Sequence, residues 1–122
     1  MNRFLKSLGF AISGVKFMLQ EPNFRIHLAA TVLVICTSFY LGLSSTEWII
    51  IIGCMGMVLA AEVFNTAVEQ LCNMTEPNFH PLIKKIKDTS AAAVLILALV
   101  AAICGSLVLL PKIIFTIQIY VS

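Results

Sequence analysis

The longest uninterrupted apolar run constrains this chain more than any other feature. Residues 91–110 form twenty consecutive positions without a charged side chain. As an α-helix, such a run is about 30 Å long, which matches the hydrocarbon core of a bilayer. The whole chain is 60% hydrophobic and 11% charged, whereas average soluble domains carry about 25% charged residues. The sequence therefore predicts an integral membrane protein.

Two more segments are long and apolar enough to cross a membrane. Before them, residues 2–20 read as an amphipathic helix with one basic face, which is typical of a helix lying in the cytoplasmic interface. Pro22 separates this helix from the first span, because proline disfavours helix at the residue before it. We expect one all-α membrane domain over residues 1–122, with spans at about residues 24–43, 47–72 and 89–110.

Four residues are candidates for the expected span boundaries. Ser45 or Thr46 is a plausible N-cap for the second span, and Asp88 for the third. Pro111 is expected to end the third span, since proline does not continue a helix.

The basic residues give the expected orientation. Seven of the eight lie before the first span, at its start, or between the second and third spans, and only Lys112 follows the third. By the positive-inside rule, the amino terminus is cytoplasmic and the carboxyl terminus lies outside. The net charge of +2 is ordinary for a protein near lipid headgroups, so we expect no nucleic-acid partner.

Two acids interrupt the second span on one helical stripe. Glu62, Asn65, Thr66 and Glu69 fall within one arc at about 100° per residue. Ionisable groups at membrane depth cost about 2.5–3.5 kcal/mol each on insertion scales, so their presence indicates a functional site. Helical rise puts Glu69 near the cytoplasmic boundary and Glu62 roughly 10 Å deeper.

Other polar residues are expected at the level of Glu69, namely Glu21, Lys87 and Asp88. Carboxylates and a lysine can together hold Mg²⁺ and a polyphosphate, and phosphoryl transfer needs mainly such positioning and charge neutralisation. The glycine-rich and catalytic-loop motifs of soluble kinases are absent from the sequence. Taken one at a time, most of these side chains could instead be solvent-exposed, cap a helix or determine the membrane topology. Glu62 is the hardest to explain structurally, because a buried acid must find a partner or stay protonated.

The stripe also carries a family resemblance. Glu62-x-x-Asn65-Thr66-Ala67-Val68-Glu69 resembles the E-x-x-N-[ST]-A-x-E signature of small bacterial integral-membrane lipid kinases, the prokaryotic diacylglycerol kinase and undecaprenol kinase family. The likeness runs from about Asn2 to Lys112. It includes the segments Glu21-Pro22-Asn23-Phe24-Arg25, His80-Pro81-Leu82-x-x-x-x-Lys87-Asp88 and Leu110-Pro111-Lys112.

The resemblance implies an ATP-dependent lipid kinase of the bacterial inner membrane, a homotrimer whose active sites are shared between subunits at the cytoplasmic face. Glu62 would be the catalytic base, and Glu21 and Glu69 would bind Mg²⁺. The lipid alcohol would lie near Phe24, Arg25, Glu62 and Asn65. The nucleotide would contact Arg3, Phe10, Glu21, Glu69, Asn78, Phe79, His80, Lys87 and Asp88.

Asn73 departs from the family pattern, which commonly has aspartate there. This removes a charge near the metal level, which puts a role for the position in doubt and could signal weaker activity. The segments His80-Pro81-Leu82 and Leu110-Pro111-Lys112 are similar to the undecaprenol-kinase branch. They favour undecaprenol over diacylglycerol as the acceptor.

Two other functions fit a three-span protein with an intramembrane acid. A small oligomeric proton-coupled exporter would favour one acid near the midplane, whereas this chain has two, biased towards the cytoplasm. A non-catalytic assembly partner would tolerate replacement of Glu62.

Overall fold

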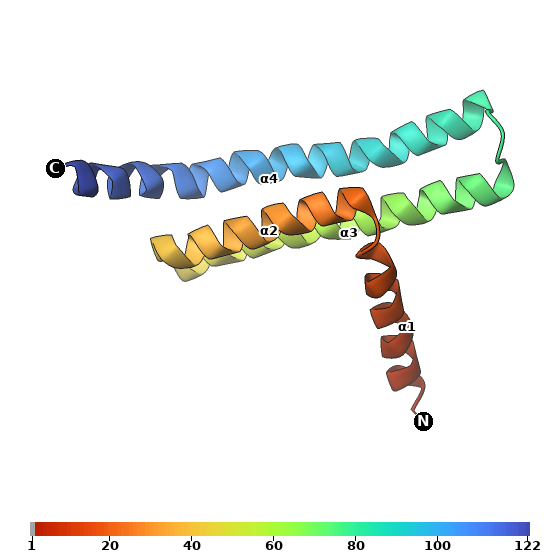
Figure 1. Cartoon of the computed structure of the whole chain (residues 1–122), viewed down its shortest axis with the longest axis horizontal. Coiled ribbons are helices and arrows are strands. Elements are labelled where there is room, and N and C mark those ends of the chain that lie inside the picture. Colours follow the sequence, from red (N-terminus) through yellow and green to blue (C-terminus); the bar gives the residue numbers. More distant parts are fainter. Residues whose placement is uncertain (1) are drawn as a thin grey trace.

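The chain is built from helices. The computed structural model describes residues 2–122, and this part of the chain contains no strand (Figure 1). The helices are α1 (Arg3–Met18), α2 (Pro22–Leu41), α3 (Ser45–Thr75) and α4 (Pro81–Val121). The last three are long and apolar enough to cross a membrane. The expected all-α architecture with three spans is confirmed.

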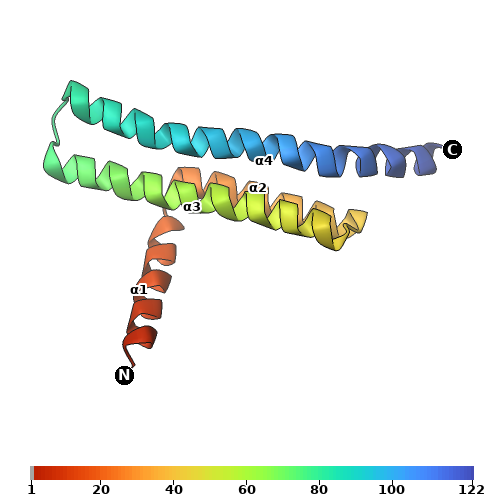
Figure 2. The same ribbon diagram turned by 180° about the vertical axis from the view of Figure 1, so that it is seen from behind.

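The three long helices lie side by side, and α1 turns away from them (Figures 1 and 2). α3 makes its most extensive contact with α4. The buried side chains recur at intervals of seven residues, which is typical of membrane helices that cross at about 20°. The side chains in this seven-residue pattern are Phe24, Thr31 and Ser38 on α2, Ile51, Val58, Asn65 and Cys72 on α3, and Val94 and Ala101 on α4; Met18, Glu62 and Thr66 are also buried.

A fixed corner joins α1 to α2. Glu21 is extended, with φ −79° and ψ 123°, and Pro22 occupies the first turn of α2. Arg25 Nε donates a hydrogen bond of 2.6 Å to the carbonyl of Leu19, just beyond the end of α1. Met18 is buried at the corner. The helix expected over residues 2–20 is confirmed as α1, and its position on the membrane surface remains a prediction.

The turn between α2 and α3 carries a reciprocal cap. Gly42 takes a left-handed conformation with φ 66°, and Ser44 caps α3. The Glu47 amide donates to Ser44 Oγ at 3.3 Å, and the Ser44 amide donates to Glu47 Oε2 at 2.8 Å. The expected cap at Ser45 or Thr46 was wrong, because a capping box requires the hydroxyl three residues before the glutamate.

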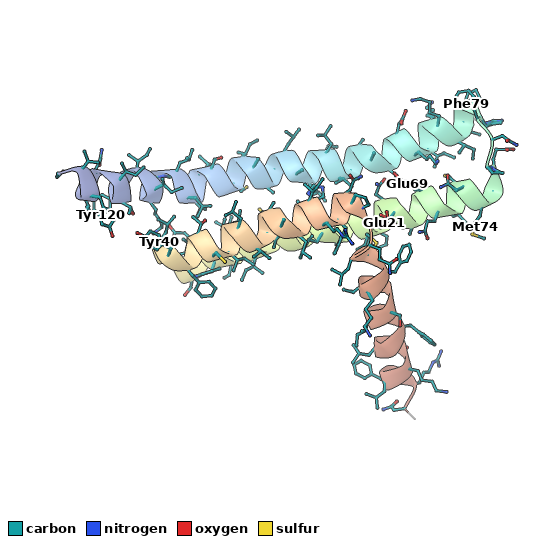
Figure 3. The ribbon with its side chains drawn as sticks, in the orientation of Figure 1. Glu21, Tyr40, Glu69, Met74, Phe79 and Tyr120 are labelled. Atoms are coloured by element: carbon teal, nitrogen blue, oxygen red, sulfur yellow. The ribbon has the colours of Figure 1, made fainter. Side chains whose placement is uncertain are left out.

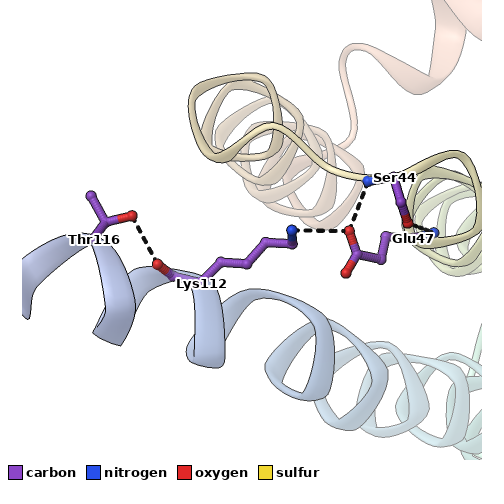
Figure 4. Close-up of polar contacts among 4 residues, drawn as sticks. All are labelled: Ser44, Glu47, Lys112 and Thr116. Atoms are coloured by element: carbon purple, nitrogen blue, oxygen red, sulfur yellow. Dashed lines mark hydrogen bonds and ion pairs between the residues drawn. The ribbon is translucent and has the colours of Figure 1, made fainter.

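An ion pair connects this turn to α4 (Figure 4). Lys112 Nζ lies 3.3 Å from Glu47 Oε2, with both side chains largely shielded from solvent. One turn further along α4, Thr116 Oγ1 donates to the Lys112 carbonyl at 2.8 Å. The second half of α4 is thereby held beside the start of α3.

The expected ends of the third span were wrong as helix boundaries. α4 starts at Pro81, where His80 Nδ1 accepts a hydrogen bond from the Leu82 amide at 3.1 Å. Asp88 therefore lies inside the helix and is not its cap. α4 also continues through Pro111, because a proline removes only one backbone hydrogen bond and membrane helices tolerate this loss.

α4 is much longer than a bilayer requires. Its 41 residues span about 61 Å, roughly twice the hydrocarbon core. A charged first part, residues 81–88, therefore extends beyond one end of the apolar region. The last part of α4 projects past the turn between α2 and α3 (Figure 1).

Candidate functional site

The polar stripe of α3 points into the helix bundle. Glu62, Asn65 and Thr66 are 3%, 4% and 5% exposed. Glu62 is the only carboxylic acid among the buried residues of the described chain. The helical period that places these side chains on one face of α3 also directs them inward, between apolar neighbours. A buried acid surrounded in this way requires a charged or hydrogen-bonding partner.

The buried amide of Asn65 is only half satisfied. Its Nδ2 donates a weak hydrogen bond of 3.4 Å to Glu69 Oε1. Its Oδ1 is buried and has no hydrogen-bond partner among the described residues. An unpaired buried acceptor costs about 1–3 kcal/mol, and such groups normally bind water, an ion or a ligand. Asn65 Oδ1 thus marks a position for a polar ligand beside Glu69.

Three titratable side chains lie near enough to Glu62 to influence it. His27 of α2, Glu69 of α3 and Glu21 at the corner before α2 all act on it electrostatically. Figure 3 shows Glu21 and Glu69 at the same level, where α1 leaves the bundle. The common level of Glu21 and Glu69 is the one that the sequence predicts, and the greater membrane depth of Glu62 remains a prediction.

His27 is a part of this cluster that the sequence analysis missed. It is partly buried and lies between Phe24 and Thr31 on the face of α2 that packs inward. A signal was available, because His27 is three residues after one buried position and four before the next. An ionisable residue on an otherwise buried helical face merits the same attention as an intramembrane acid.

The oxygen atoms of the cluster fit a hard divalent cation. No three histidine, cysteine or acidic side chains converge on one point in the described chain. Mg²⁺ does not need such a cage, since it commonly uses one or two carboxylates with phosphate oxygens and water. Glu21 and Glu69 can supply the carboxylates, and the unpaired Asn65 Oδ1 can bind a metal-bound water or the acceptor hydroxyl.

A polar pocket lies at the end of the bundle where α3 leads into α4. It has a volume of about 320 Å³. Its lining unites four residues expected to contact the nucleotide, Asn78, Phe79, His80 and Lys87. Asn73 also lines it, and Asn73 Oδ1 accepts a hydrogen bond of 2.6 Å from Lys87 Nζ.

Five of the expected nucleotide contacts do not line this pocket, namely Arg3, Phe10, Glu21, Glu69 and Asp88. Arg3 and Phe10 lie on α1, which points away from the bundle (Figure 2), and Phe10 is 76% exposed. Asp88 is exposed and forms an ion pair with Lys84 one turn earlier on α4.

Two of the expected lipid contacts, Phe24 and Arg25, lie at the start of α2. Phe24 is buried, and Arg25 donates a hydrogen bond to the carbonyl of Leu19 at the α1–α2 corner.

An apolar groove approaches Glu62 from the other side. It has a volume of about 350 Å³ and lies between α2, α3 and α4. Val58, one helical turn before Glu62, lines it together with His27. Small side chains of α4, including Ala98, Ala101 and Gly105, form much of its wall. Glu62 itself does not line the groove, but it lies one helical turn beyond Val58 on the same face of α3, towards Asn65 and Glu69.

A bundle of three membrane-spanning-capable helices with a buried acid near an apolar groove fits an enzyme that acts on a membrane lipid. The family model described as prokaryotic diacylglycerol kinase matches residues 9–109. The chain therefore belongs to the prokaryotic diacylglycerol kinase family, and it is a membrane lipid kinase.

Individual relatives agree with this assignment. The chain is 38% identical over 113 residues to the undecaprenol kinase of Bacillus subtilis, covering 92% of each chain. It is 35% identical over 109 residues to a diacylglycerol kinase of Synechocystis, covering 88% of this chain and 62% of the relative. It is 27% identical over 109 residues to the diacylglycerol kinase of Escherichia coli K12, covering 88% and 89%. These relatives are kinases, so the exporter alternative is not favoured.

Proposed function

We propose that this kinase transfers the γ-phosphate of MgATP to the hydroxyl of undecaprenol at the cytoplasmic face of the bacterial inner membrane. The carrying observation is the burial of Glu62, a carboxylate that is 3% exposed and lies one helical turn from Val58 in the wall of the apolar groove. A lipid alcohol that occupies the groove can bring its hydroxyl to this carboxylate. A water-soluble nucleotide can reach the cluster from the cytoplasm.

In the proposed reaction, Glu62 is the general base. Its carboxylate accepts the proton of the lipid hydroxyl while the hydroxyl oxygen attacks the γ-phosphorus, and ADP leaves with the bond electrons. Glu21 and Glu69 hold the nucleotide's magnesium ion, which neutralises phosphate charge when bound. The unpaired Asn65 Oδ1 orients the acceptor hydroxyl or a metal-bound water. Phe24 and Arg25 lie near the lipid headgroup.

The nucleotide is proposed to extend from the metal site into the polar pocket. Asn78, Phe79, His80 and Lys87 line that pocket, and Asp88 follows on α4. Arg3 and Phe10 contact the nucleotide of a neighbouring subunit, because α1 carries them away from their own bundle. This arrangement supports a homotrimer with shared active sites, with the amino terminus in the cytoplasm and the carboxyl terminus outside.

Undecaprenol is the preferred acceptor in this proposal, and diacylglycerol is the alternative. The relative named undecaprenol kinase shares 38% identity with this chain, whereas the Escherichia coli diacylglycerol kinase shares 27%. The apolar groove with its wall of small side chains suits a single hydrocarbon chain. Both observations favour a lipid with one long chain.

A competition assay tests the acceptor. Purified wild-type protein in detergent micelles receives γ-labelled MgATP with undecaprenol, with diacylglycerol, or with both lipids at equal mole fraction. We expect both lipids to be labelled and kcat/KM to be at least about tenfold higher for undecaprenol, a difference of about 1.4 kcal/mol. A preference for diacylglycerol would reverse the acceptor assignment. Absence of labelling in both lipids, with proton-driven export from vesicles, would overturn the kinase proposal itself.

A further inference from the structure

Lys87 is held in one place by a residue of another helix. Its Nζ donates a hydrogen bond of 2.6 Å to Oδ1 of Asn73, fourteen residues earlier in the chain. Asn73 lies in the last turns of α3 and Lys87 in the second turn of α4. A lysine side chain has a flexible four-carbon stem, so this contact selects one position from many for its ammonium group.

That position lies at the polar pocket. Asn73 and Lys87 both line it, as do Asn78, Phe79 and His80 of the connecting segment. The bond between Asn73 and Lys87 therefore fixes a cation on the wall of a pocket that opens beside the α3–α4 connection. A phosphate group entering the pocket would meet an ammonium group that is already oriented.

The charge of Lys87 is not neutralised by its partner. The other lysine of the pocket, Lys84, is paired with the carboxylate of Asp88. Asn73 supplies a neutral amide oxygen instead, so Lys87 keeps its full charge for a ligand. An aspartate at position 73 would accept the same bond but compensate that charge.

We infer that Asn73 is a positioning residue that holds the Lys87 ammonium group for the polyphosphate of the nucleotide. The inference rests on the proposed function, because it assumes that the pocket receives the nucleotide. Asn73 touches neither substrate nor metal in this account, and it acts through Lys87. Asparagine in place of the family's usual aspartate then affects the nucleotide site, and it does not remove a ligand from the metal site.

Direct nucleotide binding tests this inference separately from turnover. The affinity for MgADP is measured by displacement of a fluorescent ATP analogue from the purified full-length protein in detergent. We expect Asn73→Ala to weaken MgADP binding by about tenfold, as loss of a charged hydrogen bond would. The KM for MgATP should rise with it, while the KM for the lipid and the unfolding temperature should stay close to wild type.

Matched variants separate positioning from a general structural effect. Gln70→Ala removes an exposed amide from the same helix, and Lys85→Met removes a neighbouring cation outside the pocket; both should bind MgADP as wild type does. Asn73→Asp should fall between wild type and Asn73→Ala. In a Lys87→Met background, Asn73→Ala should have no further effect, because the two residues act as one unit.

The outcomes are distinct. Wild-type affinity in Asn73→Ala, or additive effects of Asn73→Ala and Lys87→Met, would overturn the inference and leave the kinase proposal intact. A wild-type protein that binds no nucleotide and labels no lipid would overturn both. If Asn73→Ala does not fold, Asn73→Ser gives the same test, since its hydroxyl is too short to reach Lys87.

Discussion

At the scale of residues, burial of a polar side chain in a membrane helix costs free energy, and such a residue indicates a functional site. Glu62 could be identified from the sequence because an acid at membrane depth is energetically costly and therefore indicates a function. The structure buries this residue. Two features of its surroundings were not predictable in the same way. The unpaired Oδ1 of Asn65 depends on the orientation of its amide, and the proximity of His27 depends on how α2 packs against α3.

The unpaired oxygen of Asn65 leads to a prediction about stability and activity together. Asn65→Leu removes a buried acceptor that costs about 1–3 kcal/mol while unpaired. We expect the unfolding temperature in detergent to be equal to or above that of wild type, and the kinase rate to fall at least about tenfold because the ligand-binding oxygen is lost. Thermal unfolding and initial rates measure the two effects.

Ser38→Ala is the matched control for Asn65→Leu. Ser38 is also fully buried, but its Oγ already donates to the Val34 carbonyl at 2.7 Å. Its loss should lower stability by about 0.6 kcal/mol, as is average for hydrogen bonds in membrane helices, and leave the rate unchanged. An active, destabilised Asn65→Leu protein would mean that Asn65 is only structural.

At the scale of elements, hydropathy located the helices but not their ends. The apolar runs correspond to α2, α3 and α4, because bilayer thickness sets a minimum length for each. The ends depend on local hydrogen bonds that hydropathy does not register. The side chain of Ser44 caps α3 by accepting a backbone hydrogen bond, and the side chain of His80 caps α4 in the same way. α4 continues through Pro111, which hydropathy also does not predict.

The ion pair between Glu47 of α3 and Lys112 of α4 leads to a prediction about how these two helices are held together. Glu47 and Lys112 are 3.3 Å apart and only partly exposed. Glu47→Lys and Lys112→Glu should each lower the stability in detergent by about 0.2–1 kcal/mol, because each places like charges together. The double variant should recover most of the loss. Equal destabilisation by the double and the single variants would show that the pair does not couple the two helices.

At the scale of the whole molecule, the polar groups of the bundle fall into two sets at opposite ends. The polar pocket and the Glu21–Glu69 level lie near the α1 corner and the α3–α4 connection, and the Glu47–Lys112 pair lies at the opposite end. Sequence reasoning anticipated this polarity from charge bias and helical rise. The direction of α1 was not predictable, because it follows from one turn at Glu21, and its exposed faces leave room for neighbouring subunits.

One measurement tests the central claim, that Glu62 is the base of a lipid kinase. Initial rates of phosphate transfer from γ-labelled MgATP to undecaprenol are compared for wild type, Glu62→Gln and Glu47→Gln. The two substitutions make the same change on α3, at Glu47 in its first turn and at Glu62 near its middle. We expect Glu62→Gln to lower kcat by about 10²–10⁴, as loss of a general base does, and Glu47→Gln to keep the wild-type rate. A Glu62→Gln protein with full kcat would contradict the account.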